Sequence, residues 1–234
     1  MVILPSLLAI FISFTLSASA GMGGSLILVP AMSLILGSKQ GVAIAALLLG
    51  GNNVLKVIAY RRTIPFRAAI LVVLLLMAGA AIGASLMVRV PERWVDFAVI
   101  LSFILSFISE FKMWDWLRRA SAIWSAFFAG LSSGFSGTSG PLKGVALRSL
   151  KLDRMHLVGA ASLASLAGDL TKASVYIGSS LIEPASWQVV WWALPVMPLA
   201  VLTGRLVNEK IGERSYKALF WAVIVGYTVR LFFV

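Results

Sequence analysis

The sequence predicts an all-α polytopic membrane protein made of two inverted repeats, and three observations support that prediction. Hydrophobic residues make up 60% of the 234 residues, charged residues only 12%, and the mean hydropathy is +0.96. Glycine, lysine and tyrosine recur in the same order when the chain is shifted by 116 positions. Basic residues gather between the apolar segments. A soluble domain of this size could not bury so much apolar surface in one core, so most of the chain is expected to lie in lipid.

The basic composition does not indicate a nucleic-acid partner. The formal net charge is +11, but the Lys and Arg residues lie between hydrophobic segments, where basic loops orient a membrane protein. No basic face alternates with exposed aromatic residues. The chain has no Cys and a single His, His156, which leaves few ligands for a metal ion. We therefore expect no metal, no cofactor and no nucleic acid.

The first half, residues 1–109, is expected to begin with a broken helix. Residues 1–20 end in small residues as a signal peptide does, but no basic residue precedes Lys39, so we expect this segment to be retained. A Gly/Ser-rich stretch at 21–25 interrupts the helix. The next piece, 26–36, would be about 16 Å long against a hydrocarbon core of about 30 Å, so the break is predicted to be the tip of a re-entrant hairpin. Three membrane spans follow, near 40–60, 66–88 and 93–109.

The second half, residues 120–234, follows a cytoplasmic linker at 110–119 and repeats this plan as part of one integrated membrane domain. Its break lies at 134–140, and its spans are expected near 156–177, 185–204 and 215–233. Chance would explain shared Leu and Ala, whereas polar and Gly residues matching in a fixed order favour an internal duplication. The shift of 116 positions aligns Gly21 with Gly137, Gly24 with Gly140, Lys56 with Lys172, and Tyr60 with Tyr176.

The distribution of basic residues distinguishes this plan from eight plain spans. With eight plain spans, the 18 Lys and Arg residues of the loops divide seven against eleven, which gives no orientation. If each broken helix returns to its starting side, fourteen fall on one side, which the positive-inside rule makes cytoplasmic. The other side keeps Lys39, Arg89, Arg93 and Arg230. Three spans per half is an odd number, so the halves are inverted and both termini are predicted outside.

The two breaks are the predicted substrate site. An interrupted backbone at membrane depth is tolerated where it lines a polar cavity, and the helix that follows offers free N–H groups and a positive dipole end to an anion. Glycine lets the backbone approach a ligand, and serine adds hydroxyl donors. The alternative is that these small residues only permit close helix packing. The candidate substrate-binding residues are Gly23, Gly24 and Ser25 in the first half, and Ser136, Gly137, Ser139 and Gly140 in the second.

Ionisable side chains inside the spans are costly and therefore candidates for the substrate path. Lys56 and Lys172 could offer positive charge to an anion, or could extend to the nearer interface with Tyr60 and Tyr176 as anchors, and both interpretations stay open. Asp169 lies three residues before Lys172 on the same helix face. An internal ion pair is the simplest interpretation of that spacing, and a proton-coupling role for Asp169 is the sharper one.

Three further polar residues complete the candidate substrate-binding set. Lys143, three residues past the second break, is well placed to meet an anion. Asn52 and Asn53, in the first-half stretch equivalent to Asp169, could bind substrate oxygens. A membrane protease would need a Ser/His or paired-Asp constellation, but His156 is the only His and Asp169 has no acidic partner in a span. We therefore expect no enzyme.

Three motifs resemble those of the TauE/SafE family of sulfite exporter-like membrane proteins, and the resemblance extends over essentially the whole chain. They are Gly21-x-Gly23-Gly24-Ser25 followed by Pro30, Lys56-x-x-x-Tyr60-Arg61, and Gly134-x-Ser136-Gly137-x-Ser139-Gly140. The resemblance implies movement of small anions such as sulfite or organosulfonates across the prokaryotic cytoplasmic membrane, often outward. It does not fix the substrate, because the family is broad.

We therefore expect a secondary transporter, most simply an exporter, of a small sulfur-containing anion. The alternative is an anion channel or uncoupled facilitator of the same architecture, because re-entrant hairpins in inverted repeats also build channels. ATP coupling is not expected, since the chain carries no phosphate-binding Gly-Lys-Ser/Thr loop. The expected partners are the anionic substrate and the lipid bilayer, with protons as a candidate coupling ion. A homo-oligomer stays open.

Overall fold

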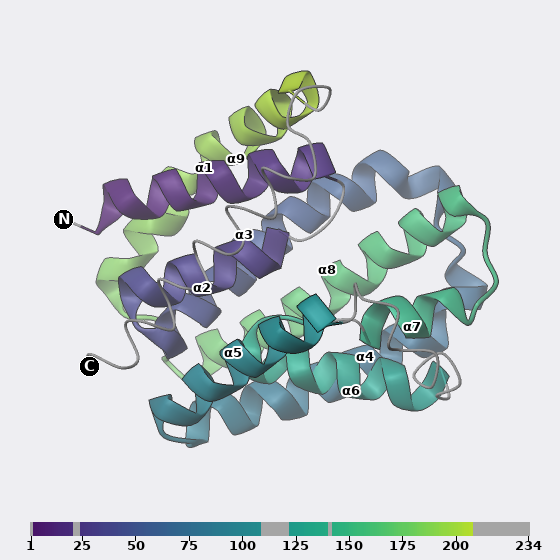
Figure 1. The fold of residues 1–234 in the computed structure, drawn as a ribbon, viewed down its shortest axis with the longest axis horizontal. Helices are drawn as coiled ribbons and strands as arrows, with labels where there is room; N and C mark the ends of the chain where they lie inside the picture. The colour runs from purple at the N-terminus through teal and green to yellow at the C-terminus, as the bar shows by residue number, and fades with distance from the viewer. Residues whose placement is uncertain (1, 21–23, 109–121, 140–141, 208–234) are drawn as a thin grey trace. The chain divides into compact units, whose positions relative to one another are not determined.

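The computed structural model describes residues 2–20, 24–108, 122–139 and 142–207, and in this part of the chain every regular element is helical (Figure 1). The α-helices found there are α1 (Ile3–Ala20), α2 (Gly24–Leu36), α3 (Ser38–Tyr60), α4 (Phe66–Arg89), α5 (Glu92–Ile108), α6 (Ala122–Ser136), α7 (Leu142–Arg148), α8 (Arg154–Gly178) and α9 (Trp187–Val207). The 3-10 segments η1 (Arg61–Thr63) and η3 (Pro184–Ser186) precede α4 and α9. The predicted all-helical class is confirmed.

The helices lie close to their predicted bounds. Helices α3, α4, α5, α8 and α9 correspond to five predicted spans, while the span at 215–233 and the linker at 110–119 lie outside the described residues. Three described stretches are long and apolar enough to cross a membrane, namely Ser38–Thr63, Phe66–Arg89 and Pro184–Gly204. The short pieces after the breaks are α2, with 13 residues, and α7, with 7. At about 20 Å and 10 Å, neither spans a hydrocarbon core of about 30 Å.

The helices fall into two compact units that do not coincide with the two halves of the sequence. Unit 1 contains residues 1–48 and 180–234, and unit 2 contains residues 49–179. Each unit therefore holds segments of both predicted halves, and α3 begins in unit 1 and ends in unit 2. Repetition between the two halves stays a sequence prediction.

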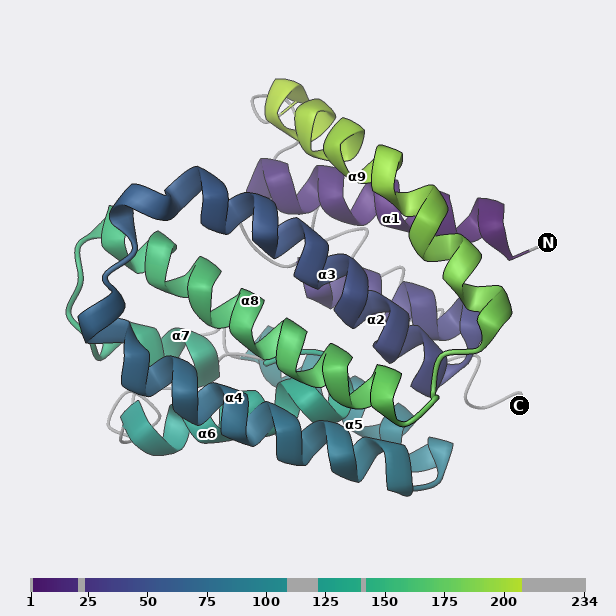
Figure 2. The ribbon, with the colours of Figure 1, turned by 180° about the vertical axis from the view of Figure 1, so that it is seen from behind.

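In unit 2, helix α4 packs along both α6 and α8 (Figure 2). Its contact with α6 depends on glycine. A Cβ added at Gly79 would lie 2.1 Å from a carbonyl oxygen of α6, and one added at Gly130 would lie 2.0 Å from a carbonyl oxygen of α4. Gly83 and Gly134, one turn further along each helix, are just as close to the opposite backbone, at 2.2 Å. These two Gly-x-x-x-Gly pairs bring the backbones into contact, as small residues do between membrane helices.

Helix α8 starts two residues before the predicted position because Asp153 caps it. The Asp153 side chain accepts a hydrogen bond from the backbone N–H of His156, at 2.9 Å, and its other oxygen lies 2.6 Å from His156 Nδ1. These hydrogen bonds favour the carboxylate, the backbone one most, and hold the pKa of Asp153 below its usual value of 3.8. The cap satisfies an N–H group that the first turn of a helix leaves without a partner.

In unit 1, α2 runs back alongside α1, and α9 also packs along α1 (Figures 1 and 2). The Thr15 hydroxyl donates to the Ala200 carbonyl, at 3.2 Å, and a Cβ on Gly204 would lie 2.4 Å from the Thr15 carbonyl oxygen. Gly37 adopts a left-handed conformation, with φ of 87°, that ends α2 and lets α3 begin at the next residue. The first predicted hairpin thus has its two arms packed together.

The second break is shorter than predicted. The sequence places it at 134–140, but α6 continues through Gly134 and ends at Ser136. Gly134 is helical, and its lack of a side chain permits close packing against the backbone of α4. Helix α7 then packs back against α6, as the predicted hairpin requires. In the first break, helix α2 begins at Gly24, so Gly24 and Ser25 also belong to a helix.

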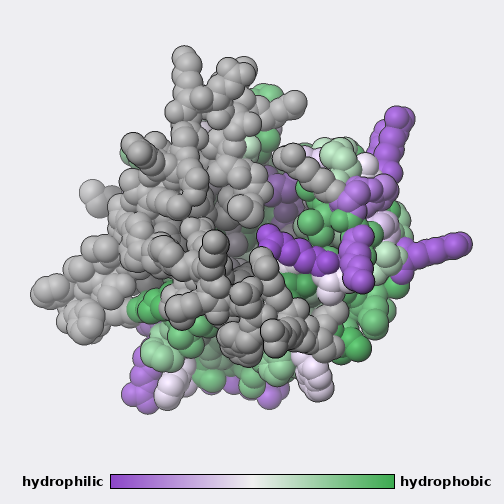
Figure 3. Space-filling model, turned by 45° about the vertical axis from the view of Figure 1, so that its right-hand side comes forward, coloured by the Kyte–Doolittle hydropathy of each residue, from purple (hydrophilic) through white to green (hydrophobic). Residues whose placement is uncertain are grey.

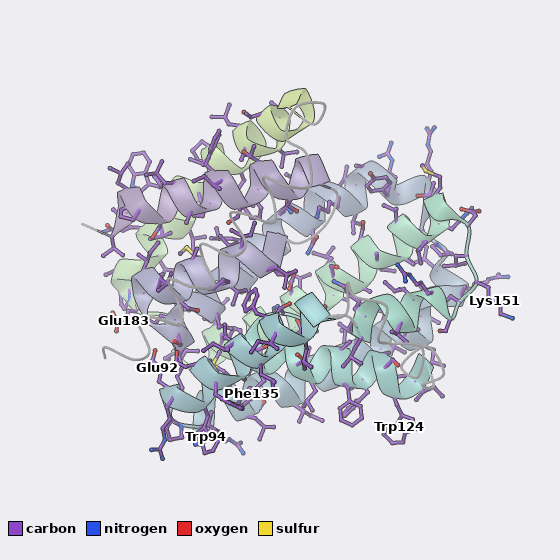
Figure 4. The ribbon with its side chains drawn as sticks, in the orientation of Figure 1. Glu92, Trp94, Trp124, Phe135, Lys151 and Glu183 are labelled. Carbon is purple, nitrogen blue, oxygen red and sulfur yellow. The ribbon has the colours of Figure 1, made fainter. Side chains whose placement is uncertain are left out.

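Exposed apolar and aromatic side chains are what a lipid-facing surface requires. Phe97 and Trp191 are 60% and 67% exposed. On the face shown in Figure 3, the coloured surface combines hydrophobic areas with separate groups of hydrophilic side chains. Figure 4 places Trp94 at one end of unit 2 and Trp124 toward the end that carries Lys151. Tryptophan at both ends of a helical bundle is typical of the two membrane interfaces.

Candidate functional site

Helix α6 ends where Gly137 turns the chain. Gly137 has φ of 81°, in the left-handed region, and its N–H donates to the Ser133 carbonyl at 3.0 Å. A residue with a Cβ would be strained in this conformation. The turn leaves the last carbonyl groups of α6 without helical partners, and these groups carry the negative end of the helix dipole.

Helix α8 supplies donors to these carbonyl groups. Lys172 Nζ donates to the Gly137 carbonyl and to the Ser133 hydroxyl, at 3.1 Å each. Tyr176, one turn further along α8, donates its hydroxyl to the Gly134 carbonyl at 2.5 Å. The positive ammonium group also lies at the negative end of the α6 dipole, which favours it. The Lys-x-x-x-Tyr spacing therefore places two donors on the face of α8 that meets the end of the broken helix.

Asp169 completes the surroundings of Lys172. One carboxylate oxygen lies 2.8 Å from Lys172 Nζ, and the other accepts a 2.7 Å hydrogen bond from the side-chain amide of Asn53. Lys172 is 1% exposed and Asp169 is 7% exposed. A buried ion pair is tolerated when hydrogen bonds satisfy its other polar atoms, and here Lys172 has three acceptors and each Asp169 oxygen has a partner. The ion pair predicted from the spacing is confirmed.

Two more ammonium groups lie within the electrostatic field of Asp169. Lys143, on α7, is half-buried and donates to the Ser165 hydroxyl of α8 at 3.0 Å. Lys56, on α3, is half-buried too, and it forms no hydrogen bond or ion pair with the residues that the structure describes. Asp169 attracts both, while Lys143 is also repelled by Lys172 and by Lys56. We call Asn53, Lys56, Lys143, Asp169 and Lys172 the cationic cluster.

The cationic cluster carries more positive than negative charge. Its three ammonium groups and one carboxylate sum to +2 when all are ionised. Charge that is removed from water and left unbalanced is costly, so a group of this kind favours a counterion. A small anion with two negative charges would balance it.

The predicted site residues divide into those of the cluster, those next to it and those elsewhere. Ser136 ends α6 and contacts α5, because its hydroxyl lies 2.7 Å from the Ser102 hydroxyl. Gly137 joins the cluster through its carbonyl, Ser139 is buried just beyond it, and Asn52 is 3% exposed. Gly24 and Ser25 belong to unit 1. The positions that fall outside the described residues are Gly23 and Gly140.

For three residues that contact the cluster or the broken helix, the structure shows a role that the sequence did not predict. Tyr176 is fully buried and is not an interfacial anchor. Ser133 and Ser165, which accept hydrogen bonds from Lys172 and Lys143, were not predicted. Tyr176 could have been found from its fixed distance to Lys172 in the repeated motif. The two serines carry no such signal, because serine is frequent throughout these helices.

A hollow of about 360 Å³ between α5 and the neighbouring ends of α4 and α6 does not suit an anion. Its lining is apolar and comprises Val90, Trp94, Phe97, Ala98, Leu101 and Phe135, two of which are labelled in Figure 4. No charged side chain belongs to that lining, so nothing there would replace the hydration of an anion. The cationic cluster is therefore the stronger candidate in unit 2.

Comparison with known proteins now fixes the family. The family model described as "Sulfite exporter TauE/SafE" matches residues 6–231, nearly the whole chain. The chain belongs to the TauE/SafE family. TauE/SafE proteins are membrane transporters of sulfur anions and not enzymes, so this chain is a multi-pass membrane transporter. No curated protein and no solved structure matched it. In this TauE/SafE protein, the cationic cluster is a partly buried group with excess positive charge.

Proposed function

We propose that this protein is a secondary transporter that exports a small sulfur-containing anion, such as sulfite or an organosulfonate, and binds it at the cationic cluster. The observation that supports this most directly is the +2 charge of three lysines that interact electrostatically with one carboxylate, with Lys172 and Asp169 almost entirely buried. Charge-assisted hydrogen bonds from ammonium groups are strong in such surroundings. Family membership supplies the class of substrate.

The inverted repeat belongs to the same proposal, and one contact favours it. The hydrogen bond between Asn53 and Asp169 joins residues that are 116 positions apart, which is also the shift that aligns the two halves. Equivalent residues of two related halves contact each other only near the axis that relates them. This supports a pseudo-twofold axis that passes close to the cationic cluster, where inverted-repeat transporters place their substrates.

The transport cycle that we propose uses the two broken helices. Movement of one hairpin-bearing part against the other switches access to the bound anion, while the short helices after the breaks contribute N–H groups. Gly24 and Ser25 in the first break, with Ser139 in the second, are the candidates for these contacts. Asp169 is the candidate for proton coupling, and the outward direction follows the family resemblance.

Calorimetric titration of the purified chain tests the proposed function. The ligands are sulfite, sulfate, thiosulfate, sulfoacetate and the zwitterion taurine. We expect saturable binding of at least one dianion and weaker binding of taurine. Lys143→Gln should weaken dianion binding about tenfold, the effect of losing a charge-assisted hydrogen bond. Arg148→Gln, which removes an exposed charge from the same helix, should not.

Two results would contradict the proposed function. Absence of binding by every sulfur anion would remove the substrate class from this chain. Equal binding by wild type and Lys143→Gln would move the binding site away from the cationic cluster.

A further inference from the structure

The two halves of the sequence carry the same lysine at equivalent positions but differ three residues before it. The shift of 116 positions aligns Lys56 with Lys172, and it aligns Asn53 with Asp169. A residue three positions before a lysine lies on the same helix face and can contact it. The second half therefore supplies its lysine with a carboxylate, and the first half supplies only a neutral amide.

Lys172 has no capacity left for a ligand. An ammonium group has three N–H donors, and those of Lys172 meet three acceptors, which are Asp169 at 2.8 Å and the oxygens of Ser133 and Gly137 at 3.1 Å. Its side chain is 1% exposed. An anion could bind Lys172 only by displacing one of these partners and opening the end of α6.

Lys56 is in the opposite situation. Asn53, three residues before it, has a neutral side chain, and its amide N–H donates to Asp169. Each oxygen of Asp169 already has a partner, Lys172 for one and Asn53 for the other. Within the described part of the chain, the Lys56 ammonium forms no hydrogen bond or ion pair, and its side chain is half-buried. Its three donors are therefore available to a ligand.

We propose that Lys56 is the primary anion-binding cation of this transporter, left available because Asn53 and not an acid precedes it by three residues. Lys172 is a positioning residue that holds the end of α6 and keeps Asp169 neutralised. Lys143 has used one donor on Ser165 and is the second cation for the ligand. This inference rests on the proposed function, and the ligand class is a small oxyanion of the kind that two ammonium groups can balance.

Four variants of the full chain in detergent test this division of roles, with sulfite and sulfate as probes at constant ionic strength. Lys56→Gln should weaken binding of the dianion that wild type binds by about tenfold or more. Lys56→Arg keeps the charge and should stay within about threefold of wild type. Arg62→Gln removes an exposed charge six residues away and should bind as wild type does. Asn53→Asp places a carboxylate before Lys56 and should weaken binding as much as Lys56→Gln.

The outcomes separate this inference from the proposed function. If wild type binds neither sulfite nor sulfate, the proposed function itself fails. If wild type binds one of them and Lys56→Gln binds it equally well, the function stands and the assignment to Lys56 is wrong. If Lys56→Arg fails to restore binding while its thermal unfolding matches that of wild type, positive charge at this position is not what holds the anion. Asn53→Asp is compared only if it elutes as a monodisperse folded protein, and Lys56→Gln decides the question without it.

Discussion

Single residues around the end of α6 show why a Lys-x-x-x-Tyr motif is useful in a membrane helix. A helix that stops inside the hydrocarbon leaves carbonyl groups without partners, which costs several kcal/mol for each group. From one face of α8, Tyr176 donates to the Gly134 carbonyl in the last turn of α6, and Lys172 donates to the Gly137 carbonyl just after it. The sequence left open whether Lys172 binds substrate and whether Tyr176 anchors the helix at the interface. In the structure both side chains stabilise the end of α6.

Replacing Lys172 tests that role. Lys172→Met leaves the buried carboxylate of Asp169 without its ion pair and removes the side-chain donor of the Gly137 carbonyl. Breaking a buried pair in this way costs about 3–5 kcal/mol. Thermal unfolding in detergent should show a large loss of stability that Lys172→Met combined with Asp169→Asn partly recovers. Lys151→Met, at an exposed lysine, should have little effect, and an equal effect of both single variants would contradict the structural role.

Gly137 and Gly144 are a matched pair of glycines in one hairpin. Gly137→Ala forces a Cβ into a conformation with φ of 81° and should lower stability by about 1–2 kcal/mol. Gly144 lies inside α7 with nothing within 4 Å of an added Cβ, so Gly144→Ala should leave stability unchanged or raise it by up to about 1 kcal/mol. The same unfolding assay measures both, and a stable Gly137→Ala would show that the turn does not need glycine.

Among the helices, the contact between α4 and α6 is the one that substitution should disturb most. Gly79→Leu introduces a side chain where even a Cβ would lie 2.1 Å from the opposite backbone, so the helices must separate. Overpacking of this kind costs about 1–3 kcal/mol and more where backbone is in the way. Gly178→Leu, at a position with open space, is the control. Both are checked by yield of monodisperse protein and by thermal unfolding, and equal behaviour would argue against close packing of α4 on α6.

Most helices could be predicted from the sequence, but their contacts could not. Long apolar runs bounded by Pro65, Pro91 and Asp153 mark the helices because proline and aspartate favour helix starts. Gly134 was predicted to belong to a break, since a glycine that permits close packing and a glycine that ends a helix look alike in sequence. Only the position of α4 beside Gly134 distinguishes the two.

The candidate site was predictable to a similar degree. The ion pair of Asp169 and Lys172 follows from a spacing of three residues within one helix. The hydrogen bond from Asn53 to Asp169, and those to Ser133 and Ser165, join residues of different helices. Such contacts depend on the register of one helix against another, which hydrophobic periodicity does not specify.

For the whole molecule, cysteine labelling can test the predicted topology without removal of any native cysteine. The sequence has no Cys, so a single introduced Cys is the only site for a membrane-impermeant maleimide. The topology predicts that Cys at position 62 or 151 is labelled only after the cytoplasmic side is opened, and that Cys at position 39 or 89 is labelled in intact cells. Labelling of all four positions from the same side would contradict the inverted arrangement.

Anion flux through the reconstituted protein tests the central claim, export of a small sulfur dianion by way of the cationic cluster. Proteoliposomes filled with sulfite are diluted into sulfite-free buffer, and release is followed over a range of internal concentrations. We predict release that saturates with concentration in wild type and falls about tenfold in Lys143→Gln, with Arg148→Gln unchanged. Release that rises linearly without saturation would indicate a channel, and release no faster than from protein-free liposomes would contradict the account.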